Sequence, residues 1–283
     1  MTMAKRIVAV FFTVALSFVA RAADNSGETA RVMLISGLTE EKAYLPRFKA
    51  IRELGKGVPL TESERFVLLA FLRRTDGTEG TDEMELAALK NDVAEHLLKL
   101  PDMPGTFARD LLEMQDDLAQ SVTWRNYCIQ FLGRTYAGTT DAELRAAVRE
   151  RLFLLTESPD PETCGTALLA LASLNSAPGI DIGSVSARAM TKAKDPTNKE
   201  GLRFTALQVA ASLGHAEAVN LAREWLAGEK AVNLRTVAIG ILGKYGTLPD
   251  RDLIVPYLQS TDPRLKGAAR TALEIPRKRR MDD

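Results

Sequence analysis

Histidine and cysteine are scarce in this sequence, with two of each among 283 residues. Such a low cysteine count excludes a disulfide-dense secreted scaffold. His96 and His215 stand far apart, and so do the two cysteines. The chain therefore has no HExxH, CxxC or paired-histidine spacing. A metal site needs several clustered ligands, and a nucleophile needs a base within hydrogen-bond reach. We therefore predict no catalytic residue, no metal site and no cofactor.

Long apolar runs are also missing, except near the start of the chain. Lys5 and Arg6 precede an apolar run of about 14 residues, whereas roughly 20 are needed to span a bilayer. Ala20 and Ala22 then place small residues at a cleavage site, which completes the pattern of a secretory signal. We predict cleavage after Ala22 and a secreted or periplasmic mature chain without a transmembrane segment. A retained membrane anchor is the alternative.

Neither sign of charge is in excess, because 37 Lys and Arg residues face 37 Asp and Glu residues. Removal of residues 1–22 takes away three basic side chains and no acidic one, which leaves 34 basic against 37 acidic residues. Binding to nucleic acid depends on neutralising phosphates. We therefore expect no nucleic-acid partner for this near-neutral, exported chain.

Helical patterning fills the rest of the sequence, and strand signals are rare. Apolar residues recur with helical spacing, as in Leu86, Leu89, Val93 and Leu97, and glycine or proline interrupts the pattern about every 10–20 residues. We predict an all-α chain of about thirteen short helices. Residues 23–60 are expected to form a polar linker and an N-terminal helix, and residues 61–275 a helical array.

A short motif recurs along the second half of the chain. A basic residue follows the first position of the motif, and a small residue comes three positions later. The motif starts at Trp124, Thr163, Leu202, Leu234 and Leu265. The steps of 39, 39, 32 and 31 residues are typical of stacked helical pairs. Cys164 departs from the pattern because it occupies the basic position.

Helix starts also repeat. Aspartate precedes proline at 160–161, 195–196 and 262–263, which predicts a capping carboxylate followed by a residue that has no N–H to leave unpaired. Thr61 with Glu64, Asp82 with Glu85, and Thr140 with Glu143 have the spacing of capping boxes. Small residues at the third motif position, such as Ala206 and Ala238, are expected to let neighbouring helices approach closely.

The motif resembles that of the HEAT family of helical hairpins, over residues 122–275. Residues 234–258 are similar to one full unit, and residues 261–273 to the first helix of the next. The resemblance implies a right-handed α-solenoid whose second helices line a concave face that holds a partner. Charged residues on the predicted second helices are then the candidates for partner binding: Arg223, Glu224, Arg251 and Asp252. A face that is only solvated is the alternative for these residues.

The two cysteines have two possible fates. Cys128 and Cys164 lie in successive first helices, and an exported protein with two cysteines is a candidate for a disulfide. Closure needs α-carbons within about 7 Å, whereas packed helices lie roughly 8–10 Å apart. The alternative is a pair of inert, buried thiols.

Three further features have a functional and a structural interpretation. Residues 76–83 are rich in acids and glycine, but they lack the spacing of a calcium loop and predict a turn that ends in a helix cap. Trp225 and Tyr257 stand 32 residues apart, either as an aromatic ladder for a ligand or as part of the core edge. Residues 276–283 form a basic tail, either solubilising and disordered or bound to an acidic surface.

The C-terminal end of the array is expected to lack a covering partner. The helix at residues 263–275 is a first helix without a second, so we expect an apolar edge there that docks another protein or a second copy of the chain.

Architecture and the lack of chemical groups together favour a non-enzymatic scaffold or adaptor that binds another protein. Two alternatives remain. One is a HEAT-like enzyme or chaperone-type lyase, and the other is a module that binds an envelope surface or a glycan.

Overall fold

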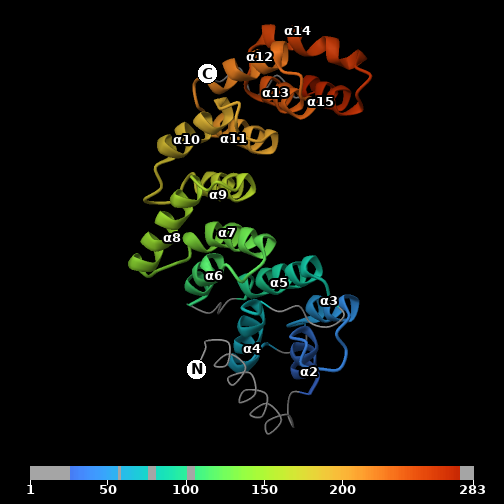
Figure 1. Cartoon of the computed structure of the whole chain (residues 1–283), viewed down its shortest axis with the longest axis vertical. Helices are drawn as coiled ribbons and strands as arrows, with labels where there is room; N and C mark the ends of the chain where they lie inside the picture. Colours follow the sequence, from blue (N-terminus) through green and yellow to red (C-terminus); the bar gives the residue numbers. More distant parts are fainter. Residues whose placement is uncertain (1–25, 57–58, 76–80, 101–105, 275–283) are drawn as a thin grey trace. The chain divides into compact units, whose positions relative to one another are not determined.

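The computed structural model describes residues 26–56, 59–75, 81–100 and 106–274. Within this part of the chain the regular structure consists of fourteen α-helices and one 3-10 helix, with no strand (Figure 1). The prediction of an all-α chain is confirmed. The predicted signal peptide at residues 1–22 and the basic tail at 276–283 lie outside the described residues.

The chain divides into two compact units, residues 1–144 (the N-terminal unit) and residues 145–283 (the C-terminal unit). The helices of the N-terminal unit are α2 (Ser26–Ile35), α3 (Tyr44–Glu53), α4 (Glu62–Leu72), α5 (Glu83–Leu98), α6 (Phe107–Asp116) and α7 (Val122–Tyr136). Helix α8 (Ala142–Leu155) begins in this unit and continues past its boundary. Helix α5 packs against α3, α4 and α7, and α6 packs against α7.

The C-terminal unit is built from neighbouring helices that pack in chain order. Its helices are α9 (Pro161–Ser173), α10 (Ile182–Lys194), α11 (Glu200–Ser212), α12 (Ala218–Gly228), α13 (Val232–Tyr245), α14 (Leu248–Ile254), η1 (Val255–Gln259) and α15 (Pro263–Glu274). Helices α9, α11, α13 and α15 contact one another in succession, while α10, α12 and α14 each pack against members of this row. The motif helices at 163, 202, 234 and 265 therefore lie side by side.

The basic position of the motif has a structural role in α7 and α11. Arg125 Nε donates to the backbone oxygen of Gln115 at 2.8 Å, and Arg203 Nε donates to that of Ala193 at 3.3 Å. Both acceptors lie in the last turn of the preceding helix, where carbonyl groups have no partner within the helix. The side chain at this position thus closes the end of the helix before it.

Cys164, which occupies the basic position in α9, makes a weaker hydrogen bond of the same kind. Its Sγ donates to the backbone oxygen of Thr156 at 3.0 Å, just beyond the end of α8. The position does not act in this way throughout the chain. Arg235 Nε is buried without a hydrogen-bond partner among the described residues, and Lys266 is exposed.

The small residues of the motif are buried in the interfaces between helices. The third motif position is fully buried in all five helices: Cys128, Ala167, Ala206, Ala238 and Ala269. Helices α13 and α15 are in close contact at Gly243, because a Cβ atom added there would overlap the Cβ of Ala272. A larger side chain at these points would overpack the interface by about 1–3 kcal/mol.

Several predicted helix caps are present. Thr61 with Glu64 and Asp82 with Glu85 form the expected capping boxes at the starts of α4 and α5. Asp160 accepts from the backbone N–H of Thr163 at 2.8 Å and so caps α9. Local sequence decides these helix starts because the capping group lies within three residues of the N–H that it accepts from.

Three predictions about helix starts are wrong. At α8 the cap is Asp141 and not Thr140, because the Asp141 carboxylate accepts from the backbone N–H groups of Glu143 and Leu144. Asp195 caps no helix. Its carboxylate accepts from Thr197 in a turn, and α11 begins later, at Glu200. Helix α2 begins at Ser26, where the sequence predicts a polar linker over residues 24–29.

That early start of α2 is stabilised by contacts far along the chain. The Glu28 carboxylate is buried, pairs with Arg31 at 2.5 Å and accepts from the backbone N–H of Gly55 at 2.8 Å. Nothing local in the sequence indicates the partner at Gly55.

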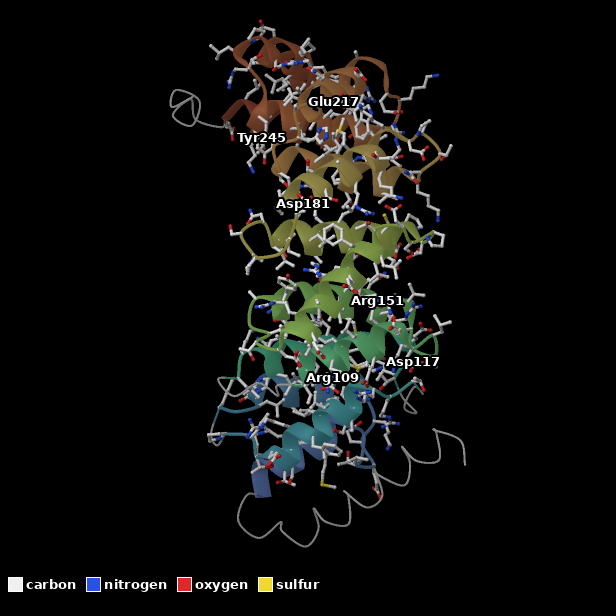
Figure 2. The ribbon with its side chains drawn as sticks, turned by 90° about the vertical axis from the view of Figure 1, so that its left-hand side faces the viewer. Arg109, Asp117, Arg151, Asp181, Glu217 and Tyr245 are labelled. Atoms are coloured by element: carbon white, nitrogen blue, oxygen red, sulfur yellow. The ribbon has the colours of Figure 1, made fainter. Side chains whose placement is uncertain are left out.

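The apolar edge expected on the last helix is also wrong. The exposed basic residues of α15 are Arg264, Lys266 and Arg270, and its only large apolar residue outside the core, Leu273, is half-buried. Over its described residues this helix therefore presents a mostly polar outer face. Exposed apolar side chains at this end belong instead to α14, η1 and the end of α13, where Tyr245 is labelled in Figure 2.

Arg203 offers a test of whether the basic residue of the motif stabilises the end of the preceding helix. Besides Ala193, its guanidinium contacts Glu229 at 3.4 Å and lies 5.0 Å from the centre of the Trp225 ring. We expect Arg203→Met to lower the free energy of unfolding by about 2 kcal/mol, because it removes a charge-assisted hydrogen bond and a cation–π contact. Arg270→Met, on the exposed face of α15, should change it by less than about 0.5 kcal/mol. Urea unfolding followed by circular dichroism measures both, and equal losses in the two variants would contradict the role of Arg203.

Candidate functional site

Arg223, the first predicted partner-binding residue, is largely committed to a structural ion pair. Its Nε and Nη2 atoms donate to the two carboxylate oxygens of Asp250 at 2.6 and 2.9 Å, joining α12 to α14. Asp250 is only 2% exposed, and its carboxylate also accepts from the N–H and hydroxyl of Thr247. The hydrogen bonds from Arg223 are the main cause that lowers the pKa of Asp250.

Of the other three predicted partner-binding residues, one makes a structural hydrogen bond and two are exposed. Arg251 Nη2 donates to the backbone oxygen of Leu273 at 2.7 Å and so closes the end of α15. Glu224 and Asp252, on α12 and α14, are exposed. Among the four predicted residues, these two acids are therefore the ones whose side chains are presented to solvent.

Trp225 and Tyr257, for which an aromatic ladder and a core edge were the two interpretations, are packed against their own unit. Trp225 is buried under Arg203, and the Tyr257 hydroxyl donates to the backbone oxygen of Leu226 at 3.0 Å. Both side chains form the edge of the core, as the structural alternative predicted. They offer no stacked surface to a sugar or peptide.

Both cysteines are free and buried. Cys128 lies in the N-terminal unit and Cys164 in the C-terminal unit. Burial raises the pKa of each thiol, above all that of Cys128, although Lys90 and Arg125 act in the opposite direction there. Thiols of this kind react slowly, because the thiolate is the nucleophile. These features match the alternative of two inert thiols, and a disulfide between the cysteines stays a prediction.

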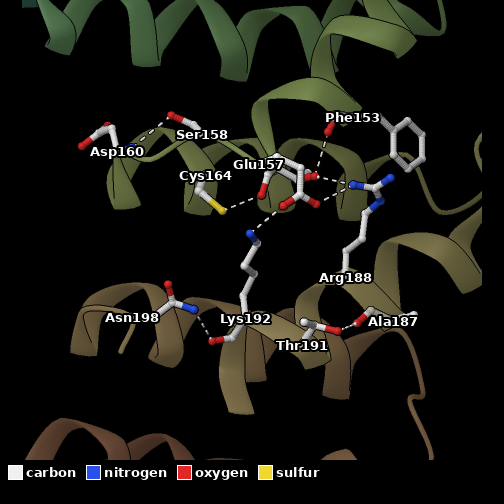
Figure 3. A network of polar contacts seen from close by, with 11 residues as sticks. Phe153, Glu157, Ser158, Asp160, Cys164, Ala187, Arg188, Thr191, Lys192 and Asn198 are labelled. Carbon is white, nitrogen blue, oxygen red and sulfur yellow. Dashed lines mark hydrogen bonds and ion pairs between the residues drawn. The ribbon is translucent and has the colours of Figure 1, made fainter. Parts of the chain in front are cut away.

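A polar network surrounds Cys164 (Figure 3). The Glu157 carboxylate pairs with Arg188 at 2.6 Å and with Lys192 at 2.7 Å, so it ties α10 to the turn after α8. Arg188 Nη1 also donates to the Thr156 hydroxyl at 3.3 Å. Each group has an opposite charge or a backbone partner, so the network has a structural explanation.

The histidines are isolated. His96 is half-buried on α5, and burial lowers its pKa while the Glu28 carboxylate acts against this. His215 follows Gly214, whose positive φ of 75° ends α11, and its Nδ1 accepts from the N–H of Glu217. Within the described ranges no three His, Cys, Asp or Glu side chains are grouped so that they could hold a metal ion.

The N-terminal unit contains a pocket that sequence reasoning did not find. It has a volume of about 440 Å³ and lies between the start of α5, the start of α7 and the residues after α4. Its lining residues are Arg74, Thr75, Glu83, Leu86, Ala87, Lys90, Ala119, Gln120, Ser121 and Val122. A volume of this size is in the usual range for small-ligand sites.

Lys90 is the most unusual residue of this pocket. It is only 2% exposed, and its ammonium donates to Gln120 Oε1 at 2.7 Å and to the backbone oxygen of Arg74. Gln120 is held in turn, because its Nε2 donates to the backbone oxygen of Arg73 at 2.8 Å. One sequence signal could have indicated the pocket, namely a lysine within the apolar stripe of α5, four residues after Leu86.

Comparison with known proteins gives no further guide. No known protein family matches this chain, and neither does any curated protein. In the part of the chain that the structure describes, none of the helices is long and apolar enough to cross a membrane.

Thiol counting distinguishes the two fates of the cysteines. We expect a thiol-exchange reagent to find two thiols in the non-reduced, denatured protein. In the folded protein both should react at least about 100-fold more slowly, because burial disfavours the thiolate. A count of zero before reduction would show that Cys128 and Cys164 are paired.

The Arg223–Asp250 pair predicts a defined pH dependence. A lowered pKa means that Asp250 contributes stability above its unfolded pKa of about 3.9, and this contribution is lost as the pH falls through the folded pKa. Asp250→Asn should cost about 2 kcal/mol near pH 7, and the difference from wild type should shrink below about pH 4. Asp252→Asn is the exposed control and should change little. A difference that is constant with pH would contradict the ionised pair.

Proposed function

We propose that this chain is a non-enzymatic scaffold or adaptor that is exported and binds another protein. We further propose that it is a HEAT-like, right-handed α-solenoid. The proposal is carried by one observation, namely that the motif helices α9, α11, α13 and α15, whose motifs start tens of positions apart, contact one another in succession. Arg125, Cys164 and Arg203 each donate to the end of the preceding helix. Repeated units of this kind build extended faces that suit binding rather than catalysis.

Glu224 and Asp252 are the proposed contact residues for the partner. Both are exposed on the second helices α12 and α14, whereas Arg223 and Arg251 carry structural hydrogen bonds. Reversing the arginines would disturb the fold as well as the surface. The acids therefore give the cleaner test.

Site-specific photo-crosslinking provides that test. A photoreactive residue at position 224 or 252 should capture one discrete partner in the native envelope. The same residue at the exposed positions Glu150 and Glu274 should not. Equal capture at all four positions, or none at any, would contradict a partner face on α12 and α14.

A charge-reversal variant then measures the strength of the contact. Glu224→Lys with Asp252→Lys should weaken binding of the captured partner about tenfold, which corresponds to about 1.4 kcal/mol for two rim charges. Glu150→Lys with Glu274→Lys is the control with the same change in charge and should bind like wild type. An unchanged affinity in the first variant would remove the two acids from the interface.

A further inference from the structure

We propose that His96 is an acid-sensitive latch of the N-terminal unit. Its neutral imidazole ring packs against Gly55, just after the end of α3. Protonation of the ring at mildly acidic pH loosens the end of α3 and the start of α2 from α5. The latch regulates how tightly this unit is packed, and it does not depend on the proposed scaffold function.

The first argument is the contact between the His96 ring and Gly55. A Cβ atom added at Gly55 would lie 3.5 Å from both Cε1 and Nε2 of His96, so the ring rests directly on the glycine. Gly55 has a positive φ of 69°, a conformation in which glycine commonly ends a helix. His96 therefore covers the point at which the chain leaves α3.

The second argument is the state of the ring nitrogen at this contact. The Nε2 atom of His96 is buried and has no hydrogen-bond partner among the described residues. A neutral imidazole tolerates this, because it can carry its one proton on Nδ1 and leave Nε2 without a hydrogen. The imidazolium has an N–H at both nitrogens. Protonation thus places a donor without an acceptor in the contact with Gly55, which is unfavourable.

Glu28 of α2 is the acid that acts on the ring, and both of its carboxylate oxygens already have a donor. Oε1 accepts from the backbone N–H of Gly55 at 2.8 Å, Oε2 pairs with Arg31 at 2.5 Å, and the residue is only 3% exposed. An N–H at His96 Nε2 would have to compete with that of Gly55 for this carboxylate. An unpaired donor and a displaced Gly55 both weaken the same contact.

Other charged groups around α5 have partners of their own. Lys99, on the same helix, is the cation that acts on the ring, and it lies 4.0 Å from Glu95. Helices α3, α4 and α7 pack against α5. Their charged side chains towards this end are engaged as follows: Glu53 with Lys56 and Arg52 with Phe48 on α3, Glu64 with Thr61 at α4, and Arg134 of α7 with Glu95.

The direction of the pH effect follows from the burial of the ring. Burial lowers the pKa of His96, and Lys99 acts in the same direction, while Glu28 opposes them. A group with a lowered pKa binds its proton less readily in the folded protein than in the unfolded chain. The N-terminal unit therefore keeps its full stability above the unfolded pKa of about 6.5 and loses part of it as the pH falls below that value.

The titration of His96 can be observed directly, because the chain has two histidines. NMR signals of the Cε1–H groups in the full-length protein are assigned with the variant His215→Gln. We expect His96 to titrate below about pH 6.5 in the folded protein. Titration at or above this value would overturn the proposal, because the proton would then not destabilise the folded unit. This measurement needs no substitution at His96 itself.

Hydrogen exchange tests whether this titration loosens the contact. After correction for intrinsic rates, residues 26–56 should lose protection at least about threefold between about pH 7.5 and about pH 5.5, whereas residues 161–173 of the C-terminal unit should not. His96→Gln cannot gain the proton and should remove the difference. His215→Gln is the matched control and should keep it. An equal loss in wild type and His96→Gln, or no loss in wild type, would overturn the latch.

Glu28→Gln measures the charge that opposes the latch. The amide keeps an acceptor for the N–H of Gly55 but removes the negative charge beside the ring, so His96 should titrate at a lower pH than in wild type. An unchanged or higher value would contradict the arrangement of the two residues. Crosslinking at positions 224 and 252 tests a face of the C-terminal unit, so the latch and the scaffold function can fail independently.

Discussion

The interaction on which the packing of consecutive helices depends is the closing of a helix's C-terminal end by a side chain from the next helix, as Arg125 does for α6 and Arg203 for α10. Helix ends leave carbonyl groups unpaired, and a short helix has a large share of them. Arg125 and Arg203 satisfy such groups in the helix before their own, so consecutive helices are tied together as well as packed. Small residues at the third motif position then let the layers approach. In α7 and α11 the motif therefore supplies both the hydrogen bond to the preceding helix and the small buried residue.

Sequence alone predicts well where the deciding contacts are local. The capping boxes at Thr61 and Asp82 and the buried alanines of the motif are specified within a few residues, and each is present as predicted. Contacts between distant residues explain the missed start of α2, whereas the caps at Asp141 and Asp195 were mispredicted although their partners are two or three positions away. Helix α2 is stabilised by Glu28 and Gly55, and the last helix is polar outside although the pattern of paired helices predicted an apolar edge.

The candidate sites also contain features that the local sequence predicts and features that depend on residues far apart in the chain. The four charged residues on α12 and α14 were predicted from their helix faces, but nothing local shows that Arg223 faces a buried Asp250 or that Arg251 reaches Leu273. The pocket was missed because its residues come from three separate segments. A buried lysine in an apolar stripe was the one signal, and such a lysine becomes informative only when its neighbours in space are known.

The cysteine at the basic position of α9 makes the hydrogen bond to the preceding turn a weak one. A thiol is a weak donor, whereas the guanidinium groups of Arg125 and Arg203 are charged and strong. The link from Cys164 to Thr156 is therefore the softest of the three joints between consecutive helices. Ion pairs from Glu157 to Arg188 and Lys192 hold the same turn, so at this point of the chain charges from α10 provide the bracing that the motif supplies elsewhere.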